Sequence, residues 1–318
     1  MGIELTTVAI RDLHVFLSVY RAVLLVLALL ISLCRFVVGN SYKQKYKEKV
    51  SKLSSQSSII RIWDSLAPSY AKLLENYPLF KLMARRLLSL TPFASHQAIA
   101  DVGAGTGLLS QEVLKIFPDI ELHVLEPASQ MVALVQKNVT GKNVHFYCLP
   151  AEAIASIPVQ LDRVFSNATF HLVELKQVFK NLSEVLKPQG KVVFNLWWHS
   201  FEETSEEDCA ARFRALVKEL LIPYGLTSPQ PNSIHPPYTR SQIIQWATQA
   251  DLDLEQVIVD RDPIPLLFFL DFMRMYSDRP HPDLTPSQRE EFFEQAQRLL
   301  IGQDATIVSV RFLIGKRC

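Results

Sequence analysis

The sequence is poor in cysteine, in net charge and in repeats, and each shortage removes a class of function. Its four cysteines include no pair at CxxC spacing, so neither a zinc site nor a disulfide framework is expected. The 33 Lys and Arg residues nearly balance the 32 Asp and Glu residues, and the net charge of +1 gives no general field that would attract nucleic acid. We therefore expect no bound metal and no nucleic-acid partner. With 48% hydrophobic residues, the chain has ample material for a packed core.

A long hydrophobic run stands near the N-terminus. Residues 22–34 read AVLLVLALLISLC, and the apolar stretch extends over 20–38 with Arg21 and Arg35 near its ends. About 20 such residues cross a bilayer as a helix, and arginines near helix ends can reach the headgroups. We expect residues 1–40 to contain one transmembrane helix that associates the protein with a membrane. A signal peptide, an interfacial helix and a buried helix of a soluble protein are the alternatives.

A polar stretch rich in lysine and serine follows at residues 41–58 and is expected to be a linker. Loops that carry an excess of lysine and arginine stay on the cytoplasmic side of a membrane. The sequence therefore predicts a single-pass protein whose remaining residues face the cytoplasm.

Residues 59–318 are expected to form one α/β domain with its core at 95–200. Short β-rich runs alternate there with amphipathic helical patterns, which indicates a parallel sheet with helices on both faces. The expected strands of this core are 98–103, 121–127, 143–149, 161–167 and 191–198; the expected helices are 108–117, 128–139 and one that ends in SEVLKPQG at 183–190. Before the core, residues 61–90 predict two or three helices broken at Pro68 and Pro78.

After residue 200 the alternation loosens, and residues 201–238 and 262–300 are expected to be helical or lid insertions. Further strands are expected at 254–261 and 305–316. Capping-box patterns begin helices at Thr239, with Gln242 three residues later, and at Thr285, with Pro286 and Gln288. The apolar run LLFFLDFMRMY at 266–276 fits an acceptor pocket, a membrane contact or plain core, and core is the commonest of these.

The motif DVGAGTG at residues 101–107 follows an expected strand and opens an expected helix. Gly103, Gly105 and Gly107 let the backbone turn tightly and approach a ligand closely. Their GxGxG spacing differs from the GxGxxG turn that binds a pyrophosphate. Asp101 at the strand end would repel a phosphate and suits a cationic ligand. These residues predict a site for a positively charged cofactor.

The next expected strand ends in Glu126, 19 residues after Gly107. A carboxylate at this place can accept hydrogen bonds from both hydroxyls of a ribose, although a solvated charge at a strand end would look the same.

Together, DVGAGTG, VLEPASQM and SNATFHLVELKQVFKNLSEVLKPQGKVVFNLW resemble the class I S-adenosylmethionine (SAM)-dependent methyltransferases. Within that class the chain resembles the small-molecule group that includes ubiquinone and menaquinone C-methyltransferases, trans-aconitate methyltransferases and malonyl-carrier-protein methyl ester synthases. The preceding WDSLAPSY is similar to the family's F-D-x-x-A-x-x-Y helix, and the resemblance covers roughly residues 60–200. It implies a Rossmann-like, doubly wound, seven-stranded and mostly parallel sheet, with SAM as cofactor.

The resemblance also implies roles for particular residues. Glu126 would hold the ribose, Met131 would pack on the adenine, and Asn167 would accept from the amino group of SAM. Tyr70 would close over the cofactor. The residues implied to line the methionine part are Asp101, Gly103, Ala104, Gly105 and Gly107.

Two positions depart from the family pattern. The family often has an aspartate for the adenine amino group, where this chain has Pro150 in the segment LPAEAI. The side chain of Glu152 or a backbone group near Ala151 would have to replace it. The family's Y-D pair is Tyr70-Ala71 here.

Two histidines are the candidates for a general base. His171 follows the fourth expected strand and His199 follows the fifth, at the carboxyl ends where parallel sheets bind ligands. A base is required only if the acceptor must lose a proton. The alternative interpretation is that each histidine is a hydrogen-bonded residue that shapes the pocket.

These observations predict methyl transfer from SAM to a small, lipophilic acceptor, and the expected membrane helix motivates the lipophilic choice. The alternatives are a catalytically inactive SAM-fold binding or scaffold protein at a membrane, and an enzyme that uses SAM without methyl transfer. The segment SNAT stands where N-P-P-Y would indicate methylation of base amino groups. The sequence predicts no particular oligomeric state.

Overall fold

The computed structural model describes residues 57–204, 209–227 and 237–317. The expected transmembrane helix and nearly all of the expected linker lie outside these residues. Among the described residues, no helix combines the length and the apolar character needed to cross a membrane. Residues Ile59–Cys318 constitute one compact unit.

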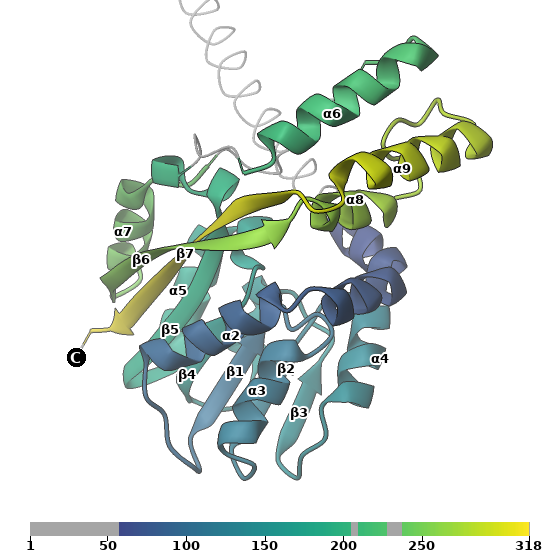
Figure 1. Ribbon diagram of the computed structural model, residues 1–318. Coiled ribbons are helices and arrows are strands. Elements are labelled where there is room, and N and C mark those ends of the chain that lie inside the picture. The colour runs from purple at the N-terminus through teal and green to yellow at the C-terminus, as the bar shows by residue number, and fades with distance from the viewer. Residues whose placement is uncertain (1–56, 205–208, 228–236, 318) are drawn as a thin grey trace, which may run out of the picture. The chain divides into compact units, whose positions relative to one another are not determined.

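The described residues form a seven-stranded sheet in the order β3-β2-β1-β4-β5-β7-β6 (Figure 1). The strands are β1 (Ala98–Val102), β2 (Glu121–Leu125), β3 (Val144–Tyr147), β4 (Leu161–Ser166), β5 (Leu186–Trp197), β6 (Leu252–Pro265) and β7 (Asp304–Lys316). Strands β1 to β5 pair in parallel, whereas β7 pairs antiparallel with both β5 and β6. The expected mostly parallel, seven-stranded sheet is confirmed. The strand order reverses between β1 and β4, and ligands bind at such a switch point in open α/β sheets.

Helices cover both faces of the sheet. Successive strand residues point to opposite sides, and here the residues on both sides are apolar and pack against helices. Ile99 of β1 packs in the core under α2 (Leu79–Leu90), α3 (Leu108–Ile116) and α4 (Ser129–Asn138). Its neighbour Ala100 packs in the core under α5 (Leu175–Val185) and α7 (Arg240–Gln249). Five strand residues in a row are thereby buried in β1, as expected for a central parallel strand.

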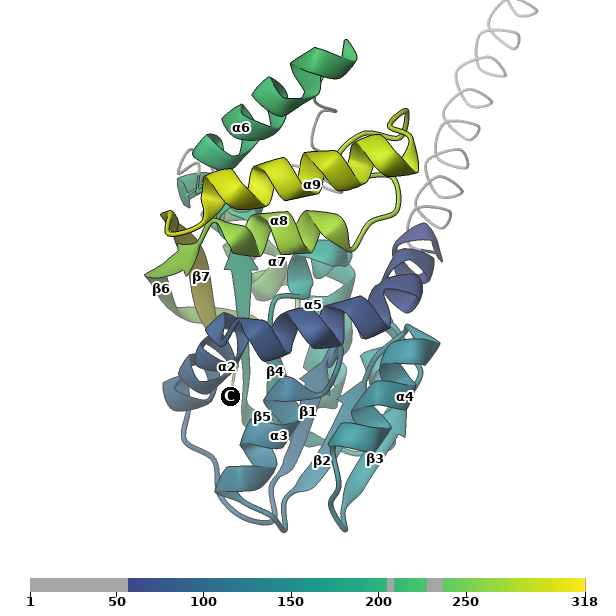
Figure 2. The ribbon, with the colours of Figure 1, turned by 45° about the vertical axis from the view of Figure 1, so that its right-hand side comes forward.

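Three further helices pack on one another through a separate apolar cluster: α6 (Ala211–Leu221), α8 (Leu267–Arg274) and α9 (Pro286–Leu300). Both views show them grouped at the end of the sheet where the parallel strands finish (Figures 1 and 2). The capping boxes predicted at Thr239 and Thr285 are confirmed, and they begin α7 and α9. The apolar run 266–276 is mainly core, since Leu266, Phe268 and Leu270 are buried.

Three expected boundaries were wrong. Residues 57–76 form one helix that continues through Pro68. The missing N–H of Pro68 is tolerated because packing stabilises the helix, and the adjacent Leu66 and Ala67 are buried. Helix α5 ends at Val185 and β5 begins at once, so Pro188 lies in the strand, which pairs irregularly with β4 at this end. Strand β6 runs on to Pro265, inside the expected insertion, because it stays paired with β7 as far as Asp304.

Candidate functional site

The glycine turn after β1 is held in a conformation that favours glycine. The φ angles of Gly103, Gly105 and Gly107 are 72°, 55° and 87°, all left-handed. A Cβ on Gly103 would stand 2.1 Å from Cγ2 of Thr169, and one on Gly107 would stand 2.5 Å from Cγ2 of Val135. A Cβ on Gly105 would meet only the ring of Tyr70, at 3.8 Å. Packing therefore requires glycine at 103 and 107, whereas at Gly105 only the left-handed backbone favours glycine.

Glu126 closes this turn from the end of β2. Its Oε2 accepts from the backbone N–H of Gly105 at 2.8 Å, and its Oε1 accepts from the N–H of Ala128 at 2.9 Å. Burial raises the pKa of the Glu126 carboxyl, the two backbone hydrogen bonds oppose this, and Asp64 adds to the rise. Each carboxylate oxygen has a further lone pair, so Glu126 can anchor the turn and still accept from a ligand hydroxyl.

Asp101 is buried in β1 and faces the start of α3. Its Oδ2 accepts from both the N–H and the hydroxyl of Ser110, at 3.0 and 2.6 Å. Burial raises its pKa to about 7, the hydrogen bonds from Ser110 oppose the rise, and the charge of Glu126 adds to it. Among the described residues, neither Asp101 nor Glu126 has a lysine or arginine partner. A cationic ligand would therefore supply a counter-charge that the described residues do not give these two carboxylates.

Tyr70 lies over the turn, on the helix of residues 57–76. Its ring is the neighbour of Gly105 and meets Trp63 and Phe80 edge-on, with centroids 5.2 and 5.9 Å apart. Burial raises the pKa of Tyr70, and Glu126 and Tyr276 raise it further. Tyr70 therefore lies beside Gly105 and close enough to Glu126 and Tyr276 for their charges to affect its pKa.

Met131 of α4 is buried against the helix of residues 57–76, beside Ala67 and Trp63. The same two helices are tied by Asp64, whose Oδ1 accepts from the N–H of Gln130 at 2.7 Å and from the hydroxyl of Ser129 at 3.1 Å. Ala128, the residue at the start of α4, has no side chain that could make these bonds. Asp64 thus caps α4 from another helix.

Asn167 and Ala168 bring the end of β4 against the glycine turn. The side chain of Asn167 donates to the carbonyl of Phe80 at 3.1 Å and accepts from Asn195 at 2.9 Å. Its backbone carbonyl accepts from the hydroxyl of Thr169, which also donates to the carbonyl of Gly103 at 3.0 Å. Two carbonyl groups, those of Gly103 and Asn167, therefore converge on one hydroxyl beside the turn.

Ala151 and Glu152 lie in a short 3-10 helix, Ala151–Ser156, packed beside α5. The carboxylate of Glu152 accepts from the N–H of Glu174 at 2.9 Å, at the start of α5. Its side chain therefore has a capping role, whereas Ala151 is buried in the core. The adenine contact predicted for these two residues stays a prediction.

The two candidate bases come together. The rings of His171 and His199 are edge-on, with centroids 6.1 Å apart. Burial lowers the pKa of His199, and the nearby charge of Arg214 in α6 lowers it further. His199 is thus predominantly neutral near pH 7, the form that accepts a proton.

Aromatic side chains from several elements gather beside Tyr70. Phe80 meets Trp197 and Phe268, with centroids 5.6 and 6.2 Å apart, and Phe268 meets Phe272 at 6.1 Å. Ala168 packs against the same apolar cluster. The surroundings of the β4 end are therefore strongly apolar.

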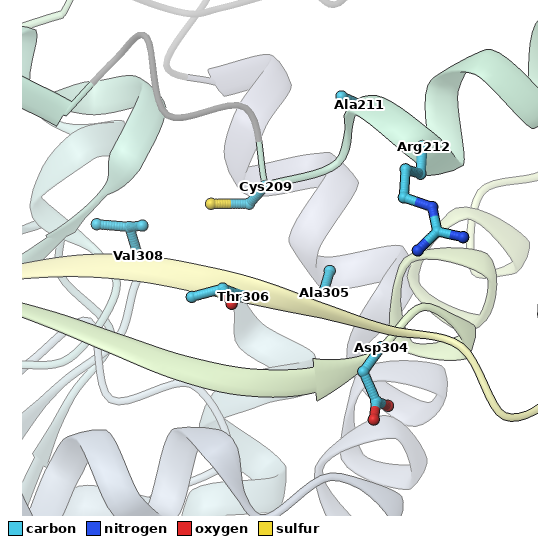
Figure 3. Close-up of a pocket in the computed structure, with 7 residues that line it drawn as sticks. All are labelled: Cys209, Ala211, Arg212, Asp304, Ala305, Thr306 and Val308. Carbon is cyan, nitrogen blue, oxygen red and sulfur yellow. The ribbon is translucent and has the colours of Figure 1, made fainter.

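A separate hollow of about 290 Å³ lies where α6 begins beside β7 (Figure 3). It is lined by Cys209, Ala211, Arg212, Asp304, Ala305, Thr306 and Val308. None of the predicted site residues lines it.

Sequence reasoning missed four residues of this arrangement: Asp64, Thr169, Asn195 and Tyr276. Asn195 could have been noticed as the one polar residue in the apolar run VVFNLW, and Asp64 as the acidic residue of WDSLAPSY. Thr169 and Tyr276 carry no local signal, because their neighbours at the site are distant in sequence.

Comparison with known proteins agrees with this geometry. Residues 99–190 match the family model described as a methyltransferase domain. Malonyl-acyl-carrier-protein O-methyltransferase of Bacillus cereus is 31% identical over 140 residues, which are 40% of this chain and 52% of that protein. The protein of the same name from Priestia megaterium is 36% identical over 128 residues, 39% of this chain and 46% of that protein. The chain thus spans about half the length of the curated relatives it matches.

Among solved structures, a protein of Bacillus halodurans C-125 assigned as a methyltransferase superposes with a TM-score of 0.50 at 13% identity. The match covers 74% of this chain and 99% of that one. At this identity the likeness shows the fold alone.

The fold and the glycine turn with its carboxylates define a class I methyltransferase domain. Residues 99–190 match a methyltransferase family, and the chain is similar to SAM-dependent small-molecule methyltransferases, which supports SAM as the cofactor. The residues at the site fit this cofactor, because three left-handed glycines keep side chains away from the turn and because Asp101 and Glu126 have no cationic partner among the described residues.

Proposed function

We propose that this protein transfers a methyl group from SAM to a small, lipophilic acceptor. The observation that carries the proposal is the glycine turn: three left-handed glycines, closed by Glu126 and covered by Tyr70. When bound, SAM supplies an electrophilic methyl group on a positively charged sulfur.

The residues of this chain would act mainly by binding and positioning. Glu126 would accept from the ribose hydroxyls, and Asp101 would stabilise the positive charge from beneath the turn. Tyr70 would exclude water from above Gly105. Holding two reactants at near-attack distance can supply much of the rate of a transfer of this kind.

The aromatic cluster supports an apolar acceptor. Phe80, Trp197, Phe268 and Phe272 pack beside Ala168, next to the end of β4. An acyl, prenyl, polyketide or terpenoid chain that enters beside Ala168 would meet apolar neighbours, because Phe80, Trp197 and Phe268 form the buried core there. The malonyl-acyl-carrier-protein O-methyltransferases named above also act on an acyl group, as their name states.

If the acceptor must lose a proton, His171 and His199 would provide the base. The neutral form of His199 would take the proton, and the edge-on contact would let His171 orient it. For such an acceptor, His199→Ala should lower kcat by about 10²- to 10⁴-fold, the usual contribution of a general base. It should leave SAM affinity unchanged.

The test uses the full-length protein and SAM labelled in the methyl group. We expect label to appear in at least one lipophilic acceptor from a panel of acyl-carrier-protein thioesters, free fatty acids, prenylated quinols and terpenoids. Transfer only to polar metabolites would refute the lipophilic acceptor. Tight SAM binding with no transfer to any acceptor would favour the alternative, a catalytically inactive SAM-binding protein at a membrane.

We also propose that residues 1–40 attach the protein to a membrane as a single-pass segment, with the methyltransferase domain in the cytoplasm. The apolar run 22–34 and the lysines after it support this proposal. Leu27→Arg should release the protein into the alkaline-extracted soluble fraction, since a charge at the centre of a span costs several kcal/mol. Equal extraction of wild type and Leu27→Arg would contradict the proposal.

A further inference from the structure

Asn195 stands out in β5 because it is polar and almost wholly buried, with 1% of its surface exposed. Its neighbours along the strand, Phe194 and Leu196, are both apolar core residues. A buried carboxamide is retained only when its hydrogen bonds are satisfied. Those of Asn195 reach across to the loop that follows β4.

The two bonds of Asn195 have a defined direction. Its Oδ1 accepts from the backbone N–H of Ala168, which can only donate, so its Nδ2 must face Asn167. Nδ2 donates to Oδ1 of Asn167, and Nδ2 of Asn167 donates in turn to the carbonyl of Phe80, which can only accept. Two amide side chains thus form a one-way relay between a backbone donor and a backbone acceptor, and neither can flip alone.

This relay holds Ala168 in an unusual conformation. Its φ is 56°, in the left-handed region that residues with a Cβ rarely adopt. The turn made there directs Thr169 under Gly103, where it fills the place of a Cβ and bonds the Gly103 carbonyl. The position of the β4 loop against the glycine turn therefore depends on the conformation of Ala168.

We propose that Asn195 is a positioning residue for cofactor binding: it locks Ala168 in the left-handed conformation and so sets the β4 loop against the glycine turn. The inference rests on the proposed function, in which this turn binds SAM. Asn195 acts through its hydrogen bonds with Asn167 and Ala168.

A double-mutant cycle in the full-length protein tests the inference, with SAM affinity measured by calorimetry. Asn195→Ala removes the hydrogen bond that holds Ala168 in the left-handed conformation. Binding of SAM must then supply the free energy of adopting that conformation, and SAM affinity should fall about tenfold. Adding Ala168→Gly should restore most of that loss, because glycine adopts the left-handed conformation freely. If the conformation of Ala168 did not limit binding, Ala168→Gly would only make the β4 loop more flexible and weaken SAM binding further.

Asp162→Ala is the matched control, since it removes a hydrogen-bonded polar side chain at the amino end of β4, opposite the relay, where Asp162 accepts from the N–H of Ala98 and from Lys187. It should lower the melting temperature and leave SAM affinity unchanged. If Asn195→Ala does not fold, Asn195→Ser, which is too short to reach either partner, takes its place in the cycle.

The inference is overturned if Asn195→Ala binds SAM like wild type, or if Ala168→Gly gives no recovery in the Asn195 variant. If folded wild-type protein does not bind SAM, the proposed function fails and the inference fails with it. The two failures are distinguishable because only the second is seen in the wild type.

Discussion

Among single residues, Asp101 gives the site its most direct pH dependence. Burial raises its pKa to about 7, so near neutral pH a large share of the carboxyl groups carry a proton. A cationic ligand favours the ionised form, so binding should release this proton. SAM affinity should therefore rise with pH, by about tenfold between pH 6 and pH 8. Calorimetry across this range checks the prediction, with the SAM affinity of wild type divided by that of Asp101→Asn at each pH. The same pH dependence in Asp101→Asn would show that another group is responsible.

The three glycines should not respond alike to alanine. Gly103→Ala combines a left-handed conformation with a Cβ 2.1 Å from Thr169, and should lower the free energy of unfolding by about 2–5 kcal/mol. Gly105→Ala meets only the ring of Tyr70, at 3.8 Å, and should lose only the conformational part, about 1–2 kcal/mol. Chemical denaturation of both variants is the measurement. Equal losses would mean that Thr169 does not press on the turn.

At this scale the sequence predicts what is local and misses what is distant. The glycine turn and Glu126 are recognisable because their spacing along the chain carries the chemistry. The bond from Thr169 to Gly103 and the bond from Gln130 to Asp64 each join residues 66 positions apart. No periodicity or motif reports such a contact, so these residues appear only in the folded structure.

Among the elements, α4 depends on a cap supplied by another helix. Asp64 accepts from Gln130 and Ser129 at its N-terminus. Asp64→Ala should lower the free energy of unfolding by about 1 kcal/mol, the usual effect of losing an N-cap, and should weaken SAM binding because Glu126 and Met131 flank this turn. Hydrogen exchange should become faster in the first turn of α4. As a control, Ser65→Ala, on the neighbouring exposed residue, should change neither property.

The elements also divide by how locally they are determined. Helices α7 and α9 could be predicted because each begins with a complete capping box, at Thr239 and at Thr285. The helix through Pro68 could not, because it is held by packing against residues far along the chain. The same applies to the end of β6, which is fixed by pairing with β7.

For the whole molecule, a partly buried ion network joins α2 to the antiparallel edge of the sheet. Arg86 bonds Asp262 at 2.6 and 2.8 Å, Arg311 bonds Asp260, and Arg311 also donates to the carbonyl of Arg86. Removing Arg86 takes the cation away from the buried Asp262 carboxylate, and removing Asp262 leaves Arg86 with the more distant Asp260 carboxylate at 3.7 Å. Asp262→Ala and Arg86→Met should each lower the free energy of unfolding by about 2–4 kcal/mol. The double variant should be about as stable as the less stable of the two single variants. Denaturant titration of the four proteins tests this, and strictly additive losses would contradict a shared interaction.

The most direct test of the account is SAM binding by calorimetry, with full-length wild type beside Glu126→Ala and Glu121→Ala. Glu121 lies on the same strand, at the opposite end from the glycine turn, so it is the matched control for loss of one carboxylate. We predict measurable binding by wild type and Glu121→Ala, and a loss of at least about tenfold in Glu126→Ala, since a hydrogen bond to a charged group contributes about 1.5–3 kcal/mol. Failure of folded wild type to bind SAM, or equal binding by all three proteins, would contradict the account.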